Sequence, residues 1–122
     1  MDKAQGGASL YSVLAGRGYF PKARLPGYNR PDFGLPHLPH RGTVPGVDVS
    51  TGSLAQGFST ALGIAFAGKI RRSSYRAFVL MSDGACQEGQ TWEAAISASA
   101  LRLDNLAVVV DSNGFQACGR TK

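Results

Sequence analysis

Two continuous runs of apolar residues dominate the second half of the chain. One covers Arg76–Ser82 (RAFVLMS) and the other covers Leu106–Val110 (LAVVV). Neither run alternates apolar with polar residues, which is typical of parallel strands that are covered on both faces. We therefore expect two neighbouring strands of a parallel sheet, with further strands supplied from beyond Lys122 or by a partner.

The stretch between these runs has the spacing of a helix. Parallel strands need a crossover connection of a dozen or more residues, and Gly89–Leu101 is long enough to supply it. A second apolar stretch with helical spacing lies upstream. The fold class that these patterns predict is α/β, a parallel sheet flanked by helices. The helical positions are Trp92, Ala95, Ile96 and Ser99 in the crossover, and Phe58, Leu62, Ala65 and Phe66 upstream.

Oxygen-bearing side chains follow both predicted strands. Ser-Asp-Gly ends the first run, with Asp83 at its centre, and Asp-Ser-Asn ends the second, with Asn113 last. Ligands of parallel α/β units gather at the carboxyl ends of strands, and neighbouring strands lie roughly 4.8 Å apart. A carboxylate and a carboxamide suit a hard cation such as Mg²⁺, which usually shares its ligands with a phosphate. Gly84 would let the backbone approach that phosphate. The pattern predicts a metal-bridged diphosphate.

Each of these sites, taken alone, is also an ordinary turn. Asp83-Gly84 and Asn113-Gly114 are common turn formers after a strand. Two features favour a binding site over two unrelated turns. The pair is separated by one strand-helix-strand unit, and it is matched by a third element upstream.

That third element is PGVDVSTGSLAQG, residues Pro45–Gly57, which precedes the upstream helical stretch. The spacing from Gly52 to Gly57 resembles a phosphate-binding P-loop. Phe58, however, occupies the position where that motif needs a lysine. A P-loop is therefore excluded.

Four blocks of the chain, in order, resemble the diphosphate-binding domain of transketolases, which are thiamine-diphosphate enzymes. The resemblance implies an enzyme that transfers two-carbon ketol units between sugar phosphates in carbohydrate metabolism, often as a dimer. The blocks are SLYSVLAGRGYFPKARL (Ser9–Leu25), PGVDVSTGSLAQG, SDGACQEGQTWEA (Ser82–Ala94) and LDNLAVVVDSNGFQACG (Leu103–Gly119).

The resemblance implies a set of metal and diphosphate ligands. Asp83 and Asn113 are similar to the family's two side-chain ligands of Mg²⁺ or Ca²⁺, and Phe115 to the residue whose carbonyl oxygen completes the set. Gly84 is similar to the glycine beneath the diphosphate of thiamine diphosphate. Asn113 is thereby also a cofactor-binding residue.

The same resemblance implies further contacts around the cofactor. Gly52 and Leu54 are similar to positions along the thiamine moiety. Glu88 and Glu93 resemble two glutamates of a proton-relay network across the subunit interface, and Glu88 is also counted among the cofactor-binding residues. Their spacing alone indicates only surface carboxylates, because residues five apart lie on different faces of a helix.

Two histidines lie in the proline-rich segment LPHLPHRGTVPG, which reads as a loop. Either His37 or His40 is similar to the histidine of the family's Gly-His-Pro block, and the spacing does not decide between them. A metal site made of this His-x-x-His pair is disfavoured, because Pro39 prevents a helix from presenting both rings and no further ligand accompanies them. The alternative is a solvent-exposed loop.

The chain departs from the family pattern in three ways. Asp2-Lys3-Ala4-Gln5 aligns with a Ser-Lys-Gly-His block, so that Gln5 stands where a histidine would contact substrate and cofactor. Glutamine can hydrogen-bond but cannot become cationic near neutral pH. Ser82 replaces the first glycine of Gly-Asp-Gly. Finally, 122 residues leave no room for the family's pyrimidine-binding and third domains.

Composition and charge add little that is specific. We expect residues 1–122 to form a single partial domain, with an irregular connection at about 16–46. Thirteen Lys and Arg against 8 Asp and Glu give a net charge of +5. The basic residues are scattered, which argues against nucleic acid and suits anionic sugars and cofactor. No apolar run is long enough for a membrane, and the two cysteines form no paired motif, so the expected location is cytoplasmic.

Three functions remain open from the sequence. The first is the Mg²⁺ and thiamine-diphosphate binding portion of a transketolase-like enzyme, completed by a pyrimidine-binding subunit or domain in a homo- or hetero-oligomer. The second is a noncatalytic transketolase-like fragment or dimerisation module, which Gln5 favours. The third is a phosphate-binding α/β protein of another family, for which Asp83 would be dispensable.

Overall fold

The computed structural model describes residues 1–121, apart from the side chains of Ala4 and Phe33. The chain divides into two compact units. The first consists of Met1 and residues 3–52, and the second consists of Asp2 and the residues from Ser53 onward. Asp2 therefore belongs to the second unit although it lies near the start of the chain.

The first unit is built around one α-helix. A short 3₁₀ helix, Ala4–Gly6, leads into α1, Gly7–Gly16. Two further 3₁₀ helices follow, Lys22–Gly27 and Pro31–Phe33, and the rest of this unit is turns and extended chain. The Pro and Gly content of this part explains the short elements, because proline removes a backbone donor and glycine weakens longer helices.

Aromatic and aliphatic side chains from α1 and the following turns form the core of the first unit. Tyr11 is fully buried, its ring lies edge-on to that of Tyr28, and its hydroxyl donates a hydrogen bond of 2.9 Å to the carbonyl oxygen of Pro36. Burial, and to a smaller extent the neighbouring Tyr28, raises the pKa of Tyr11 above its usual value. The buried members of this core are Tyr11, Leu14, Ala15, Phe20, Leu35, Val44 and Val47.

The second unit contains the predicted strand-helix-strand element. β1 covers Ala77–Ser82, α3 covers Gly89–Ala100 and β2 covers Leu106–Asp111. The two strands are parallel and in register from Ala77 opposite Leu106 to Ser82 opposite Asp111. The α/β fold with a parallel sheet and flanking helices is confirmed.

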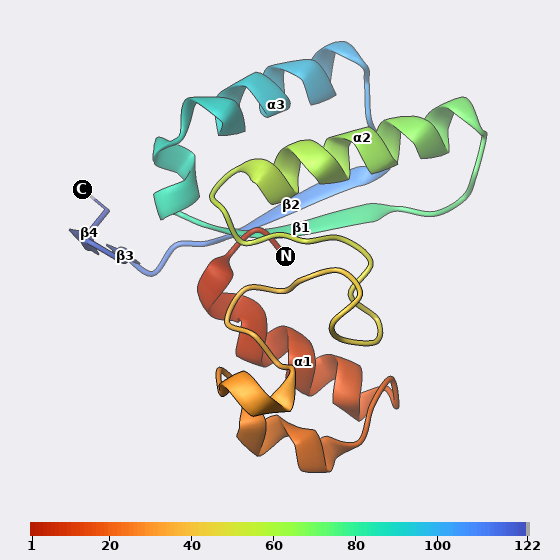
Figure 1. The fold of residues 1–122 in the computed structure, drawn as a ribbon. Helices are drawn as coiled ribbons and strands as arrows, with labels where there is room; N and C mark the ends of the chain where they lie inside the picture. The colour runs from red at the N-terminus through yellow and green to blue at the C-terminus, as the bar shows by residue number, and fades with distance from the viewer. Residues whose placement is uncertain (122) are drawn as a thin grey trace. The chain divides into compact units, whose positions relative to one another are not determined.

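Two helices cover one face of this small sheet. α2, Gln56–Ile70, and α3 lie on the same side of β1 and β2 (Figure 1). Val79 and Met81 of β1 pack there with Phe58 of α2 and Ala94 of α3. Burying such side chains stabilises the fold by about 1.5–3 kcal/mol each.

The opposite face of the sheet is exposed, which differs from the burial on both faces that the apolar runs indicated. Phe78 is 66% exposed and Val109 is 56% exposed, although both belong to apolar strands. The physical reason is that α2 and α3 pack against one face only. The composition of the strands is that of a sheet with two covered faces. In this chain the helices cover one face, and there mainly β1, because Val108 and Val110 on the same face of β2 are still 39% and 43% exposed.

A small hairpin follows β2. β3, Phe115–Gln116, pairs antiparallel with β4, Gly119–Arg120. It lies beyond the carboxyl end of β2 (Figure 1). None of the helices in the described residues is long and apolar enough to cross a membrane.

Candidate functional site

The carboxyl ends of β1 and β2 bring together the acidic and amide side chains that the sequence singled out. The backbone N–H of Asp83, the first residue after β1, donates to the carbonyl oxygen of Asp111, the last residue of β2, at 3.2 Å. This bond continues the parallel ladder by one residue. It fixes the two strand ends side by side, so that the turns carrying Asp83 and Asn113 emerge together.

The carboxylate of Asp83 is the centre of a hydrogen-bond network. Its Oδ1 accepts from the backbone N–H of Gly84 at 3.0 Å. Its Oδ2 accepts from the backbone N–H of Gly114 and from the hydroxyl of Thr121, both at 2.8 Å. The Thr121 hydrogen bond, together with the backbone donors, lowers the pKa of Asp83 below its usual value, against an opposing effect of desolvation. The residue is therefore ionised at neutral pH.

Asn113 lies in the turn after β2. Its Oδ1 accepts a hydrogen bond of 2.9 Å from the backbone N–H of Phe115. Gly114 follows with a φ of +75°, a left-handed conformation that favours glycine. That turn directs the Gly114 N–H toward Asp83, and so it couples the Asn113 turn to the carboxylate. Asp83, Asn113 and Phe115, the three predicted metal ligands, therefore belong to one connected cluster.

The donor set of this cluster suits a hard divalent cation. A carboxylate offers roughly four acceptor positions, and three of those on Asp83 are taken by protein donors. An ionised carboxylate, an amide oxygen and a backbone carbonyl are the ligand types that Mg²⁺ and Ca²⁺ prefer. No group of three or more His, Cys, Asp or Glu side chains among the described residues could hold a metal ion. A cation here would depend on Asn113 and the Phe115 carbonyl as well as on Asp83.

Gly84 is buried at the start of the 3₁₀ helix Gly84–Gln87. A Cβ atom added there would lie 3.0 Å from Cβ and 3.3 Å from Oε1 of Gln116. The side chain of Gln116, from the hairpin, thus occupies the space beside Gly84. Neither Gln116 nor Thr121 was recognised from the sequence, because each lies more than 30 residues from the glycine or aspartate that it contacts.

Ser82 forms part of the same turn. Its side chain is buried, and its hydroxyl oxygen accepts from the backbone N–H of Ala85 at 3.2 Å. The serine therefore provides a hydrogen bond that the glycine of the family pattern cannot provide, because its hydroxyl accepts from an N–H of the 3₁₀ helix whose N-cap residue is Asp83.

Glu88 lies directly before α3 and Glu93 lies within it, and both are exposed. Glu88 is the residue at the N-terminal boundary of the helix, with extended backbone, rather than a member of a helix face. Glu93 lines a cavity of about 270 Å³ with Ser59, Gln90 and Ser97 between α2 and α3. The relay role that the resemblance implies for these two residues stays a prediction.

The loop before α2 supplies Gly52 and Leu54. Gly52 is buried with a φ of +119°, a conformation that L side chains rarely adopt. Leu54 is half-buried and packs against the core that contains Phe58 and Val79. Gly52 belongs to the first unit and Leu54 to the second.

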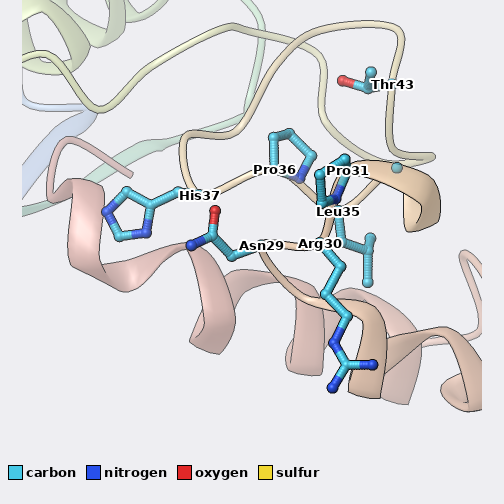
Figure 2. A pocket seen from close by; sticks show the side chains of 8 residues that line it. Asn29, Arg30, Pro31, Leu35, Pro36, His37 and Thr43 are labelled. Atoms are coloured by element: carbon cyan, nitrogen blue, oxygen red, sulfur yellow. The ribbon is translucent and has the colours of Figure 1, made fainter.

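The two histidines belong to the first unit and have different environments. His37 Nδ1 lies 2.9 Å from the hydroxyl of Tyr28, and its ring lines a cavity of about 340 Å³ (Figure 2). His40 Nδ1 donates to the carbonyl oxygen of Arg41 at 3.0 Å. Figure 2 shows the Asn29 side chain directed toward the His37 ring, whereas the Arg30 side chain extends away from it. Gln5, in the 3₁₀ helix Ala4–Gly6, is exposed.

Comparison with known proteins identifies the family. The family described as transketolase, thiamine diphosphate binding domain, matches residues 4–122. The chain is 41% identical over 121 residues to an apulose-4-phosphate transketolase subunit of Actinobacillus succinogenes, covering 99% of this chain and 44% of that protein. It is 44% identical over 123 residues to the 6-deoxy-6-sulfo-D-fructose transketolase subunit SqwG of Clostridium sp., covering 100% of this chain and 44% of that protein.

The fold agrees with this identification. The transketolase from Leishmania mexicana superimposes with a TM-score of 0.81 at 32% identity, covering 92% of this chain and 18% of that chain. The chain thus spans less than half the length of the relatives it matches. The resemblance drawn from the sequence blocks is confirmed, and the chain belongs to the transketolase family, within its thiamine-diphosphate-binding domain.

Proposed function

We propose that this chain is the metal- and diphosphate-binding portion of a transketolase-like enzyme, in which Asp83 anchors Mg²⁺ and thereby the diphosphate of thiamine diphosphate. One observation carries the proposal. The Asp83 carboxylate is held at the carboxyl end of β1 and is tied, through the Gly114 N–H, to the turn that bears Asn113. Two neighbouring strand ends therefore present hard oxygen ligands in one cluster.

Each residue of the cluster has a distinct role in this proposal. Asp83 supplies the negative charge, and Asn113 Oδ1 and the Phe115 carbonyl supply neutral oxygens. Gly84 has no side chain that would block a phosphate group, and the Gln116 side chain that occupies the space beside it would have to move for that group to bind.

The rest of the cofactor and the substrate engage other residues of the chain. Gly52 and Leu54 would lie along the thiamine moiety, and Glu88 and Glu93 would link the site to a second subunit in a dimer. Either His37 or His40 would contact the substrate. When bound, thiamine diphosphate supplies the carbon nucleophile on which two-carbon ketol transfer depends.

A pyrimidine-binding subunit or domain would complete the site. Both relatives above are named as transketolase subunits, and their names specify a phosphorylated sugar and a sulfonated sugar. An anionic sugar, such as a sugar phosphate, is the substrate class that we propose. The net charge of +5 is favourable for attracting such a molecule. We propose a cytoplasmic, oligomeric enzyme of carbohydrate metabolism.

Calorimetric titration tests the binding function directly. Thiamine diphosphate should bind the protein in the presence of Mg²⁺ about tenfold or more tightly than in the presence of EDTA, a difference of about 1.4 kcal/mol. The physical reason is that a cation held by Asp83 would neutralise the negative charge of the diphosphate. The titration is repeated with the pyrimidine-binding partner present, and no metal-dependent binding in either case would refute the proposal.

A second candidate function is a noncatalytic binding or dimerisation module, favoured by Gln5 at the position of a family histidine. If that substitution is what limits catalysis, Gln5→His in the completed assembly should raise kcat/KM for the ketose donor by about tenfold or more, because a positioned acid or base contributes about 10²–10⁴-fold. Gln5→Asn, which also cannot transfer a proton, is the matched control. An unchanged rate in Gln5→His would contradict the alignment of the N-terminal block.

A further inference from the structure

Asp2 is the most completely buried charged side chain among the described residues. Its exposed fraction is 0%. Its backbone N–H donates to the carbonyl oxygen of Leu80 in β1 at 2.7 Å. Its Oδ1 accepts from the backbone N–H of Gly57 at 2.7 Å, and its Oδ2 accepts from that of Ala55 at 3.1 Å. One residue therefore joins the β1 strand to the start of α2.

The start of α2 has no local cap, which explains why a remote carboxylate is used. Ala55 precedes the helix and makes no side-chain capping bond. The first N–H groups of a helix lack partners within the helix and favour negative charge. A carboxylate offers two oxygens, so that it can accept from two of these donors at once. Asp2, more than 50 residues away in the sequence, thus accepts the hydrogen bonds that a local serine or aspartate cap would accept.

The backbone conformation of Ala55 is unfavourable by itself and must be stabilised by contacts such as those with Asp2. Ala55 has a φ of +65°, a left-handed conformation that is unfavourable for a residue with a Cβ atom. Such a conformation persists only where surrounding contacts hold it. The Asp2 carboxylate accepts hydrogen bonds from the N–H of Ala55 itself and from that of Gly57, the second residue after it, and so it stabilises this turn.

Gly57 packs directly against Asp2, in addition to donating a hydrogen bond to it. A Cβ atom added to Gly57 would lie 2.8 Å from Asp2 Oδ1 and 3.0 Å from its Cα and Cβ atoms. The first distance is shorter than real Cβ contacts and the other two are unusually short, and the Asp2 side chain is itself short and fully buried. A larger residue at position 57 would therefore displace the carboxylate.

We propose that Asp2 is a positioning residue for the loop before α2, in which Leu54 would lie along the cofactor. It fixes the turn that follows Leu54 to β1, the strand that directly precedes Asp83, and so it holds the loop before α2 and the metal ligand in one arrangement. This inference rests on the proposed function for the assignment of Leu54 to the cofactor. The hydrogen-bond geometry around Asp2 stands independently of that assignment.

Hydrogen exchange of the intact protein tests the geometric part. In Asp2→Asn, one of the two backbone donors loses its acceptor and faces an NH₂ group instead. The amide hydrogen that loses its acceptor, that of Ala55 or that of Gly57, should then exchange about tenfold faster, since an unsatisfied buried donor corresponds to about that factor or more. The amides of α3 should exchange as in the wild type. Asp104→Asn, at an exposed aspartate of the same unit, is the matched control and should leave residues 53–58 unchanged.

Thiamine diphosphate affinity in the presence of Mg²⁺ tests the positioning part. We expect Asp2→Asn to weaken binding by about tenfold. Tyr75→Phe serves as a destabilised comparison, because it removes the hydrogen bond from the Tyr75 hydroxyl to the Ile64 carbonyl without contact with the loop. Tyr75→Phe should lower thermal stability but leave the affinity unchanged, which separates positioning from general stability. Gly57→Ala, which displaces the carboxylate without removing its charge, should reproduce both effects of Asp2→Asn.

Two results would overturn the inference. Unchanged exchange at Ala55 and Gly57 in Asp2→Asn would show that the carboxylate does not hold the turn. Faster exchange with unchanged affinity would show that the turn does not position the cofactor. A wild-type protein that fails to bind thiamine diphosphate refutes the proposed function instead, and in that case the exchange data still decide whether Asp2 holds the turn.

Discussion

Asp83→Asn is expected to weaken Mg²⁺-dependent binding of thiamine diphosphate by about 100-fold or more, since even the outer partners of metal ligands contribute about 10–100-fold to metal affinity. The substitution keeps the size of the side chain and one acceptor oxygen. It removes the charge that the Thr121, Gly114 and Gly84 hydrogen bonds hold in place. The measurement is calorimetric titration of the cofactor with and without Mg²⁺.

The controls for this prediction separate ligand loss from unfolding. Asp104→Asn removes an exposed carboxylate of the same unit and should bind the cofactor as the wild type does. The circular dichroism spectrum of Asp83→Asn should remain that of the wild type. Undiminished metal-dependent binding in a folded Asp83→Asn protein would eliminate the metal site and favour a phosphate-binding protein of another kind.

Met81→Ala is expected to lower the free energy of unfolding of the 122-residue chain by about 2–5 kcal/mol, the usual cost of truncating a buried methionine. Met81 is only 1% exposed and lies in the core between β1 and the helices α2 and α3. Its truncation leaves a cavity that the surrounding helices fill only in part. Urea denaturation monitored by circular dichroism measures the change.

Val109→Ala is the matched substitution on an exposed position of β2. Val109 is 56% exposed, so its truncation should change the free energy of unfolding by less than about 0.5 kcal/mol. A similar loss in both variants would contradict a sheet that is covered on one face only. The free energies of unfolding of the same two variants, measured in the complete assembly, show whether a partner covers this face.

The parallel strands and their crossover helix could be predicted because each depends on local sequence. The apolar runs at 76–82 and 106–110 became β1 and β2, and the crossover helix ends within one residue of the predicted boundary. The exposure of Val109 could not be predicted in the same way, because an apolar composition shows only that a strand can be buried on both faces. Which of its faces is covered depends on the helices that are present.

The candidate site was predictable in part for a similar reason. Asp83 directly follows β1 and Asn113 is the second residue after β2, and parallel strands in register bring their carboxyl ends to one edge. The contacts of Thr121 with Asp83 and of Gln116 with Gly84 had no such signal. Both residues reach the site through the hairpin β3–β4, whose path depends on the left-handed turn at Gly114.

The sequence by itself determined the family, the α/β class and the strand-end positions of Asp83 and Asn113, because motif order and apolar periodicity are properties of neighbouring residues. Only the tertiary structure decided that Asp2 caps α2, since that contact joins residues more than 50 positions apart. A hydrogen bond of this kind depends on where two backbone N–H groups point after the chain has folded. No local pattern of residue types specifies that direction.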